Sequence, residues 1–285
     1  MSPKAPVVNG LSFDVEEYFH ALNLRAAAPI QSWERQERRV AASTYRIMEQ
    51  LARHQVRATF FFLGWVAERD PGLVRAVHAA GHEIGSHGMS HQMAGELGPE
   101  RFRAEARDSK RLLEDAISGP VEGFRASTFS ITRETEWAFE ILAGEGYRYD
   151  SSVFPVRHDR YGHPEFSRTP LIVETGAGPL LEIPMLTLRV CGLNLPAAGG
   201  GYLRLLPLVL IQQALWRMNR SGHPGVLYLH PWEFDVDQPR LLNAGLPALR
   251  HYFGLARTEP RLERLLKRFR FGPLGRIAGP VSPAD

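Results

Sequence analysis

Short apolar segments typical of buried strands alternate with helical patterns along most of the sequence. The strand-like segments are 7–13, 57–63, 82–86, 121–127, 147–150 and 225–231, and the helical patterns are 40–51, 70–81, 99–117, 132–142 and 207–219. Because parallel neighbours need a crossover between them, usually a helix, this alternation predicts a parallel sheet. We therefore expect an α/β fold, most simply a complete or distorted (β/α) barrel.

Ionisable residues stand where five of these strand-like segments end. In such folds the chemistry lies at the carboxyl ends of the strands, which meet on one side of the sheet. Here those ends read Asp14-Val15-Glu16, Ser86-His87, Arg125, Asp150 and His230. The sequence thus predicts one site that draws residues from five strands.

Two histidines in "SHGMSH" suggest a metal site. His87 and His91 are four residues apart, so on a helical turn both imidazoles would project to one side and could bind one cation. A catalytic metal usually has three protein ligands, and the third could be Asp14 or Glu16, which share one face of a strand. The other acid would then be free as a base. Glu17 would face the opposite way, as a surface charge.

Two further strand-end residues suit hydrolysis of an amide. Arg125 could hold the free carboxylate ionised through a bidentate pair. His230 in "LYLHPWEF" could protonate the departing amine. His20 is interpreted as an ordinary loop histidine.

Composition excludes several classes of site. The net charge is only +3, with 34 basic residues scattered among 31 acidic ones, so no nucleic-acid surface is expected. Cys191 is the only cysteine, which excludes an internal disulfide and a multi-cysteine zinc site, and we expect it to be a small buried side chain. No signal peptide or membrane span is read from the sequence, so the expected location is cytoplasmic.

We expect one domain over residues 1–285, with 235–285 as a C-terminal helical extension packed on it. Segment 151–205 is rich in turn residues and reads as a flexible rim, and its "AGGGY" lacks the lysine of a phosphate loop. The basic, amphipathic "RLERLLKRFRF" near the C-terminus is expected to pack against the barrel; peripheral contact with an anionic membrane is the alternative.

An ordered set of motifs runs over nearly the whole chain: "FDVEEYFH", "ATFFFLGWVAER", "GHEIGSHGMSH", "GFRASTFSI", "YRYDSSVFP", "GGGYLRLLP" and "LYLHPWEFD". This set resembles the polysaccharide deacetylase family, carbohydrate esterase family 4, and especially the subgroup encoded with bacterial exopolysaccharide and exosortase loci. The resemblance implies a distorted (β/α) barrel with seven or eight parallel strands and a divalent metal, commonly zinc, although other divalent transition metals are open.

The resemblance also assigns roles. Asp14 matches the family's catalytic base, and His87 and His91 match its metal histidines. Arg125 matches the arginine that orients the base, and His230 matches the histidine acid.

One further residue matches a family position less closely, and two residues depart from the family's pattern. Asp150 matches, less closely, an acidic residue that supports the histidine acid. Most members have two adjacent aspartates in the first motif, whereas here Val15 takes the second place, so Glu16 must be the metal ligand. Ser127 stands after "RA" where most relatives have a proline, which puts in doubt the oxyanion-binding backbone around Thr128.

The expected function is metal-dependent removal of N-acetyl groups from amino sugars of a bacterial exopolysaccharide or its precursor, with an N-acetylated glycan as substrate. Two alternatives stay open. One is a metal hydrolase of a small cyclic amide or imide, and the other is an inactive carbohydrate-binding or scaffold protein of a polysaccharide assembly complex. The oligomeric state and the partner proteins are not predicted.

Overall fold

The computed structural model describes residues 6–158 and 160–279. Its strands are β1 (Asn9–Val15), β2 (Thr59–Phe62), β3 (Glu83–Ser86), β4 (Gly123–Phe124), β5 (Tyr149–Asp150), β6 (Leu171–Thr175), β7 (Gly178–Glu182), β8 (Thr187–Val190), β9 (Leu193–Pro196), β10 (Val226–Leu229) and β11 (Phe271–Gly272). Its α-helices are α1 (Val40–Arg53), α2 (Gly64–Arg69), α3 (Pro71–Ala79), α4 (Ala94–Ile117), α5 (Trp137–Gly144), α6 (Gly201–Leu205), α7 (Leu208–Arg220), α8 (Leu246–Tyr252), α9 (Thr258–Leu266) and α10 (Gly275–Ala278).

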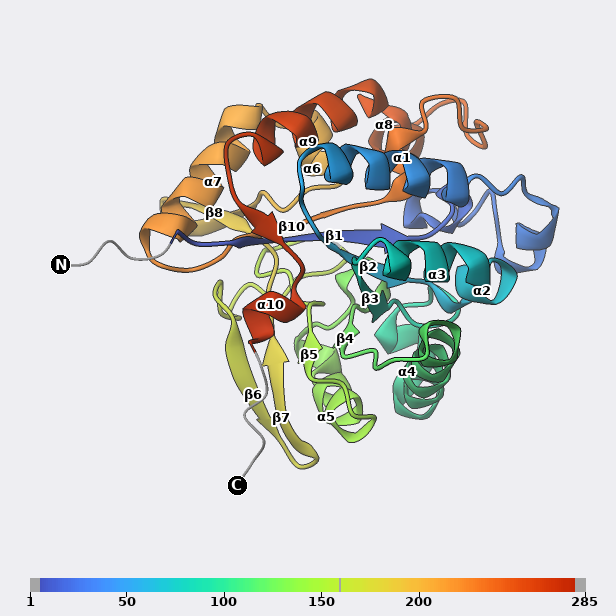
Figure 1. Ribbon diagram of the computed structural model, residues 1–285, viewed down its shortest axis with the longest axis horizontal. Coiled ribbons are helices and arrows are strands. Elements are labelled where there is room, and N and C mark those ends of the chain that lie inside the picture. The colour runs from blue at the N-terminus through green and yellow to red at the C-terminus, as the bar shows by residue number, and fades with distance from the viewer. Residues whose placement is uncertain (1–5, 159, 280–285) are drawn as a thin grey trace.

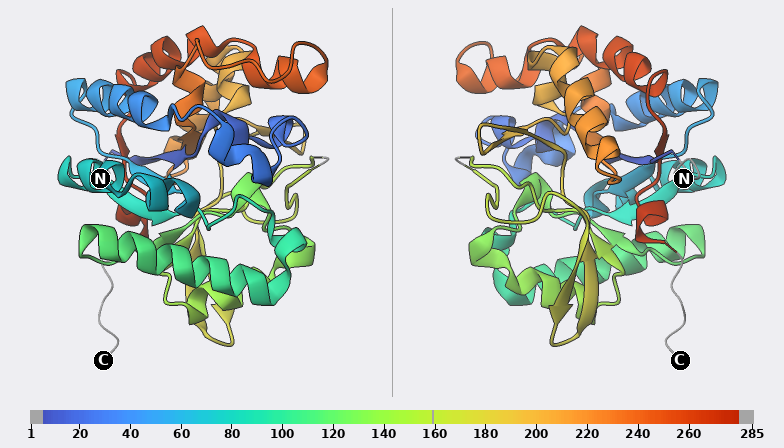
Figure 2. Two further views of the ribbon diagram at one scale, coloured as in Figure 1. Left: turned by 90° about the vertical axis from the view of Figure 1, so that its right-hand side faces the viewer. Right: turned by 90° about the vertical axis from the view of Figure 1, so that its left-hand side faces the viewer.

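The main sheet has the strand order β10-β1-β2-β3-β4-β5-β7-β6, with β11 beside β1. Every neighbouring pair from β10 to β7 is parallel, and only β6 pairs antiparallel, with β7. Helices surround the sheet, with α1, α7 and α9 over β1 and β10 (Figures 1 and 2). The expected α/β fold with a mostly parallel sheet is confirmed.

A few backbone hydrogen bonds, instead of a continuous strand ladder, connect the two ends of the parallel run. After β7 the chain continues so that Leu186 N donates to Val226 O of β10 at 3.1 Å. On the same edge of β10, Gly200 N donates to Tyr228 O at 3.1 Å and Tyr228 N donates to Ala198 O at 2.8 Å. Gly199 has φ of +133° there, and a side chain on it would overlap the carbonyl oxygen of Tyr228. The "AGGGY" segment therefore lets the chain approach β10 closely.

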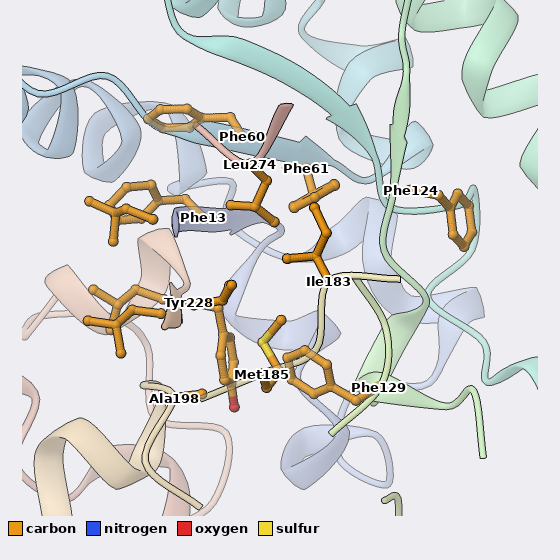
Figure 3. Close-up of a cluster of buried hydrophobic side chains, with 14 of the residues drawn as sticks. Phe13, Phe60, Phe61, Phe124, Phe129, Ile183, Met185, Ala198, Tyr228 and Leu274 are labelled. Carbon is orange, nitrogen blue, oxygen red and sulfur yellow. The ribbon is translucent and has the colours of Figure 1, made fainter. Parts of the chain in front are cut away.

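The core fills the interior of this curved sheet. Phe13 and Phe60, from adjacent strands, stack with ring centroids 5.0 Å apart. Ile183 and Met185, which follow β7, are fully buried and point into the same cluster as Tyr228 of β10 (Figure 3). The strands thus form a packed interior, and only their carboxyl ends are left to line a cavity.

Local signals explain where helices begin and end. Asp70 Oδ1 accepts a hydrogen bond from Leu73 N at 2.9 Å, so Asp70 caps α3, and Pro71 is its first residue. Gly81 follows the helix with φ of +78°. The predicted helix start and stop are both confirmed.

Three predictions about the less regular segments were wrong. Segment 151–205 contains two hairpins, β6–β7 and β8–β9, instead of a structureless rim. Cys191 is exposed at the β8–β9 turn. The C-terminal extension is not only helical, because β11 adds to the sheet beside β1.

The C-terminal amphipathic segment packs on the protein as expected. Leu262 and Leu265 of α9 are fully buried, and Leu266 is 7% exposed. Among the described residues, no helix combines the length and apolar character needed to cross a bilayer.

Candidate active site

The carboxyl ends of β1, β3, β4 and β10 meet around one cavity of about 290 Å³. Asp14 lies in β1 one residue before its end, and Glu16 follows β1 directly. His87 follows β3 and His230 follows β10. All four residues line this cavity, together with His91. Strand ends thus meet at this cavity as predicted, but Asp150, at the fifth predicted strand end, is not among the residues that line it.

Glu16, His87 and His91 form a group that could hold a metal ion. One ligand atom from each lies within 4.8 Å of the other two. Their donor set, two imidazoles and one carboxylate, suits zinc and other first-row transition metals.

Neighbouring groups orient two of these ligands. His87 Nδ1 donates to the backbone oxygen of Arg125 at 2.7 Å, which leaves Nε2 with the lone pair that a metal needs. Trp232 Nε1 donates to Glu16 Oε1 at 3.0 Å. Outer contacts of this kind are typical of metal sites, where they set the tautomer and the direction of the ligand.

An unsatisfied atom supports the fit of a cation. Glu16 Oε2 is buried and accepts no hydrogen bond of acceptable geometry from the described residues, although His91 Nε2 lies only 2.5 Å away. A buried carboxylate oxygen without a partner is costly, and a bound cation would satisfy it. Burial alone would raise the pKa of Glu16, but the interactions with His91, His230 and His87 outweigh it and hold the pKa below its usual value. Burial lowers the pKa of His87 to about 4, which keeps it neutral as a ligand.

The loop that carries His91 differs from the helical turn predicted for "SHGMSH". Gly88 and His91 both have positive φ, +71° and +53°. Glu105 of α4 holds this loop, since its Oε2 accepts hydrogen bonds from Met89 N and Ser90 N, each at 3.1 Å. The two histidines converge through this turn and not through helical periodicity.

Asp14 is positioned as the free carboxylate beside this group. Its Oδ1 accepts a hydrogen bond from Arg125 Nη1 at 2.9 Å, and Arg125 is fully buried. The same Nη1 donates to Ser12 Oγ, and Nε and Nη2 donate to Ser151. The pair is thus held by one hydrogen bond and is not bidentate as predicted. Asp14 Oδ2 lies 3.9 Å from His230 Nε2 across the cavity.

Glu233, which the sequence reasoning missed, supports His230. His230 Nδ1 lies 2.8 Å from Glu233 Oε1, and Arg204 Nε donates to Glu233 Oε2 at 2.8 Å. Burial alone would lower the pKa of His230, but the hydrogen bond with Glu233 and the charges of Glu16, Glu233 and Asp14 raise it above its usual value. The spacing of three residues in "HPWE" was the available signal, because it lets the side chain of Glu233 return to His230.

Asp150 does not fill the supporting role predicted for it. It is fully buried at the end of β5, where it accepts a hydrogen bond from Ser152 Oγ at 2.5 Å. Ser152 Oγ in turn accepts from Ala126 N at 2.7 Å. Burial raises the pKa of Asp150 to about 6, and burial together with Asp150 raises the pKa of Glu182. Within the part of the chain that the structure describes, Asp150 makes no hydrogen bond with His230. Through Ser152, it stabilises the backbone at Ala126 instead.

Glu17 is buried, contrary to the surface role predicted for it, and His20 is buried in the turn that follows β1. The Glu17 carboxylate accepts hydrogen bonds from Arg39 N and Val40 N, at the N-terminus of α1. His20 Nδ1 accepts from Glu17 N at 3.1 Å, and its ring lies against Trp33. These residues support the turn after β1 that presents Glu16.

The backbone around Thr128 lines the opposite side of the cavity. Thr128 and Phe129 have φ of +58° and +52°, which is rare for residues with bulky side chains. Ser127, which replaces the usual proline, is buried in the same turn.

Two family models match consecutive parts of the chain. Residues 36–148 match the polysaccharide deacetylase model, and residues 151–278 match a domain of unknown function, DUF3473. Both parts contribute strands to the one main sheet.

Curated relatives match shorter stretches. A peptidoglycan-N-acetylglucosamine deacetylase of Bacillus cereus is 33% identical over 78 residues, which are 27% of this chain and 37% of the relative. A chitooligosaccharide deacetylase of Rhizobium leguminosarum is 36% identical over 100 residues, 35% of this chain and 44% of the relative. The chain thus spans less than half the length of these relatives.

Solved structures share the fold over nearly the whole chain. A candidate polysaccharide deacetylase from Mycobacterium smegmatis has a TM-score of 0.63 at 21% identity, covering 98% of this chain and 93% of that one. Puue allantoinase has a TM-score of 0.60 at 17% identity, covering 98% and 91%. Both likenesses concern the fold. The match to the polysaccharide deacetylase model is confined to residues 36–148.

Proposed function

We propose that this protein is a metal-dependent hydrolase that removes N-acetyl groups from the amino sugars of an N-acetylated glycan. The observation that carries the proposal is the placement of Asp14. Its Oδ1 is bonded to Arg125, while its Oδ2 faces His230 across a cavity that also holds the Glu16, His87 and His91 group. The family-model match over residues 36–148 and the names of the matched relatives support the reaction class.

Glu16, His87 and His91 would hold a divalent cation, with zinc proposed as the ion. When bound, such an ion supplies Lewis-acid polarisation of a carbonyl and lowers the pKa of water.

The chain's own residues would carry the proton transfers. Asp14 would accept the proton of the attacking water through Oδ2, and Arg125 keeps Asp14 in place through Oδ1. The backbone N–H of Thr128 is the proposed donor to the oxyanion. His230, which Glu233 orients through Nδ1, would give a proton from Nε2 to the departing amine. The products would be acetate and a free amino sugar.

The physiological substrate is proposed to be a bacterial exopolysaccharide or its precursor. This finer assignment rests on the resemblance of the whole motif set. A cytoplasmic location likewise stays a prediction.

Acetate release tests the function. The protein, reconstituted with zinc, would be assayed on chitooligosaccharides, peptidoglycan fragments, an N-acetylated exopolysaccharide and a small cyclic amide. We expect acetate from at least one glycan and no ring opening of the cyclic amide. Ring opening alone would support the small-amide alternative, and metal binding without either reaction would support the scaffold alternative.

The metal site has its own test. His87→Ala and His91→Ala should each remove tight metal binding and acetate release while the circular dichroism spectrum stays unchanged. His78→Ala, on the exposed face of α3, is the matched control. A folded His87→Ala or His91→Ala protein with a full equivalent of metal and normal turnover would reject the site.

A further inference from the structure

One long segment of the chain carries positive charge without any acidic residue. From Ile183 to Trp232 the sequence contains arginines at 189, 204, 217 and 220 but no aspartate or glutamate, although the whole chain holds 31 acidic residues among 285. This segment builds β8, β9, α6, α7 and β10. Arg204 is buried in the contact with Glu233, and the other three arginines are exposed.

Large apolar side chains are exposed on the same segment. Val209 and Trp216 are seven residues apart on one face of α7 and are 52% and 51% exposed. Val190 and Leu193 are paired at the end of the β8–β9 hairpin and are 40% and 65% exposed.

Contacts join the helix face to the hairpin. Arg217 Nη1 donates to Arg189 O at 3.0 Å, which joins α7 to β8 near the turn of the hairpin. Figure 1 shows α7 and β8 side by side at the left of the molecule. We name this region the α7–hairpin surface: Val190, Leu193, Val209, Trp216, Arg189, Arg217 and Arg220.

The arginines of this surface have no carboxylate to neutralise them. Among the described residues, no acidic oxygen lies within ion-pair distance of Arg189, Arg217 or Arg220. The Arg220 guanidinium instead lies over the Trp216 ring, 4.6 Å from its centroid. Burial lowers the pKa of the neighbouring Arg168, and the charges of Arg189 and Arg217 lower it further, as expected where positive charges gather.

We propose that the α7–hairpin surface docks the protein on an anionic lipid bilayer. Tryptophan and aliphatic side chains enter the boundary between headgroups and acyl chains, while long arginine side chains extend their guanidinium groups to lipid phosphates. The charge complementarity favours an anionic bilayer as the occupant, because the surface offers apolar groups and arginines that are not paired with any acid among the described residues.

The position of this surface is compatible with catalysis. β1 runs away from the side where α7 and β8 lie, and it ends at the opposite side, next to the candidate active site (Figure 1). The right-hand view of Figure 2 presents the docking side to the viewer. A docked molecule would therefore hold its cavity away from the lipid and open to a glycan.

Vesicle co-sedimentation of the full chain tests the proposal. Vesicles of phosphatidylcholine with phosphatidylglycerol should bind the protein, and vesicles of phosphatidylcholine alone should bind it much less. Binding should fall as salt rises, because charge supplies much of the attraction. Each of Arg189→Gln, Arg217→Gln and Arg220→Gln should lower the partition coefficient about fivefold.

The apolar part is tested by Leu193→Ser combined with Trp216→Ser. This variant should lose most binding, with its melting temperature unchanged. The matched controls are Ile172→Ser, an equally exposed apolar residue on β6, and Arg75→Gln, an exposed arginine on α3. Both controls should bind vesicles as the unmodified protein does.

Three outcomes would overturn the proposal. The first is equal binding to both kinds of vesicle, or none to the anionic kind. The second is loss of binding in the control variants but not in the surface variants. The third is self-association in light scattering that Leu193→Ser abolishes without any vesicle binding, which would assign the surface to a second copy of the chain.

Discussion

His230 and Glu233 form a buried pair at the end of β10, with Nδ1 and Oε1 2.8 Å apart. Arg204 donates to the second oxygen of Glu233, so the carboxylate is held from both sides. Because Nδ1 is engaged in this way, only Nε2 of His230 faces Asp14 and Glu16. The pair thus determines which nitrogen of His230 can exchange a proton with a substrate.

Glu233→Gln should weaken this arrangement without emptying the metal site. An amide can still contact His230 but cannot balance the charges of His230 and Arg204. We expect turnover to fall by about 10²-fold, within the range of general acid contributions, while the metal content stays at one equivalent. Steady-state acetate release and elemental analysis check this, with Glu263→Gln, on α9 at a surface ion pair with Lys267, as control. Unchanged turnover would remove Glu233 from the supporting role.

We expect Glu16 to act as a metal ligand and Glu17 as the cap of α1, so substitutions at these two positions should have different effects. Glu16→Ala should lose tight metal binding. Glu17→Ala should keep it but should be less stable by about 1 kcal/mol, because the first N–H groups of α1 lose their acceptor. Metal titration and thermal unfolding of both variants measure this. Normal metal affinity in Glu16→Ala with loss in Glu17→Ala would reverse the assignment.

Glu105→Ala should loosen the His91 loop. Removing the acceptor of Met89 N and Ser90 N frees the turn that brings His91 to Glu16. Outer-shell changes typically cost ~10–100-fold in metal affinity. Competitive titration with a chelator measures the affinity, and Glu100→Ala, exposed on the same helix, is the control. A metal affinity equal to that of the control would show that the His91 loop keeps its conformation without Glu105.

The buried pair of Asp150 and Glu182 should make stability depend on pH. Burial raises the pKa of Asp150 from 3.8 to about 6. Its folded-state pKa thus exceeds the unfolded value, so the stability it contributes is fully present below pH 4 and is lost as pH rises through about 6. The loss is on the order of 3 kcal/mol.

Glu182→Gln should flatten this dependence, because burial and Asp150 raise the pKa of Glu182 and the variant has no carboxyl there to titrate. Unfolding free energies at pH 4 and pH 8 give the comparison, with Glu174→Gln, exposed on β6, as control. An equal drop between the two pH values in Glu182→Gln and in the unmodified protein would exclude the pair as its source.

Local signals made much of the fold and the site predictable. The alternation of apolar strands and helices can be read from the short-range periodicity of apolar residues. In a parallel sheet the carboxyl ends of the strands must meet on one side. Asp14 and His230 could therefore be placed together from positions far apart in sequence. Strand alternation, which continues one residue past β1, placed Glu16 on the same face as Asp14. The proposal of Glu16 as the metal ligand came from the family resemblance.

Features that depend on tertiary packing could not be predicted in this way. The β6–β7 and β8–β9 hairpins are partly exposed and rich in turn residues, so the alternation of apolar and polar residues along their strands is weak. The burial of Glu17 depends on where α1 begins, more than twenty residues later. Glu233 and Asp150 are both acids near strand ends, and only the packing of Arg204 shows which of them supports His230.

The most direct test of the account measures metal content and acetate release together in Asp14→Asn. Glu16, His87 and His91 remain in this variant, so it should keep a full equivalent of metal. Its turnover should fall by at least about 10²–10⁴-fold, because an amide cannot accept the proton of the attacking water. Substrate affinity should change far less than turnover. Loss of the metal would place Asp14 among the ligands, and near-normal turnover with metal bound would contradict its role as the base.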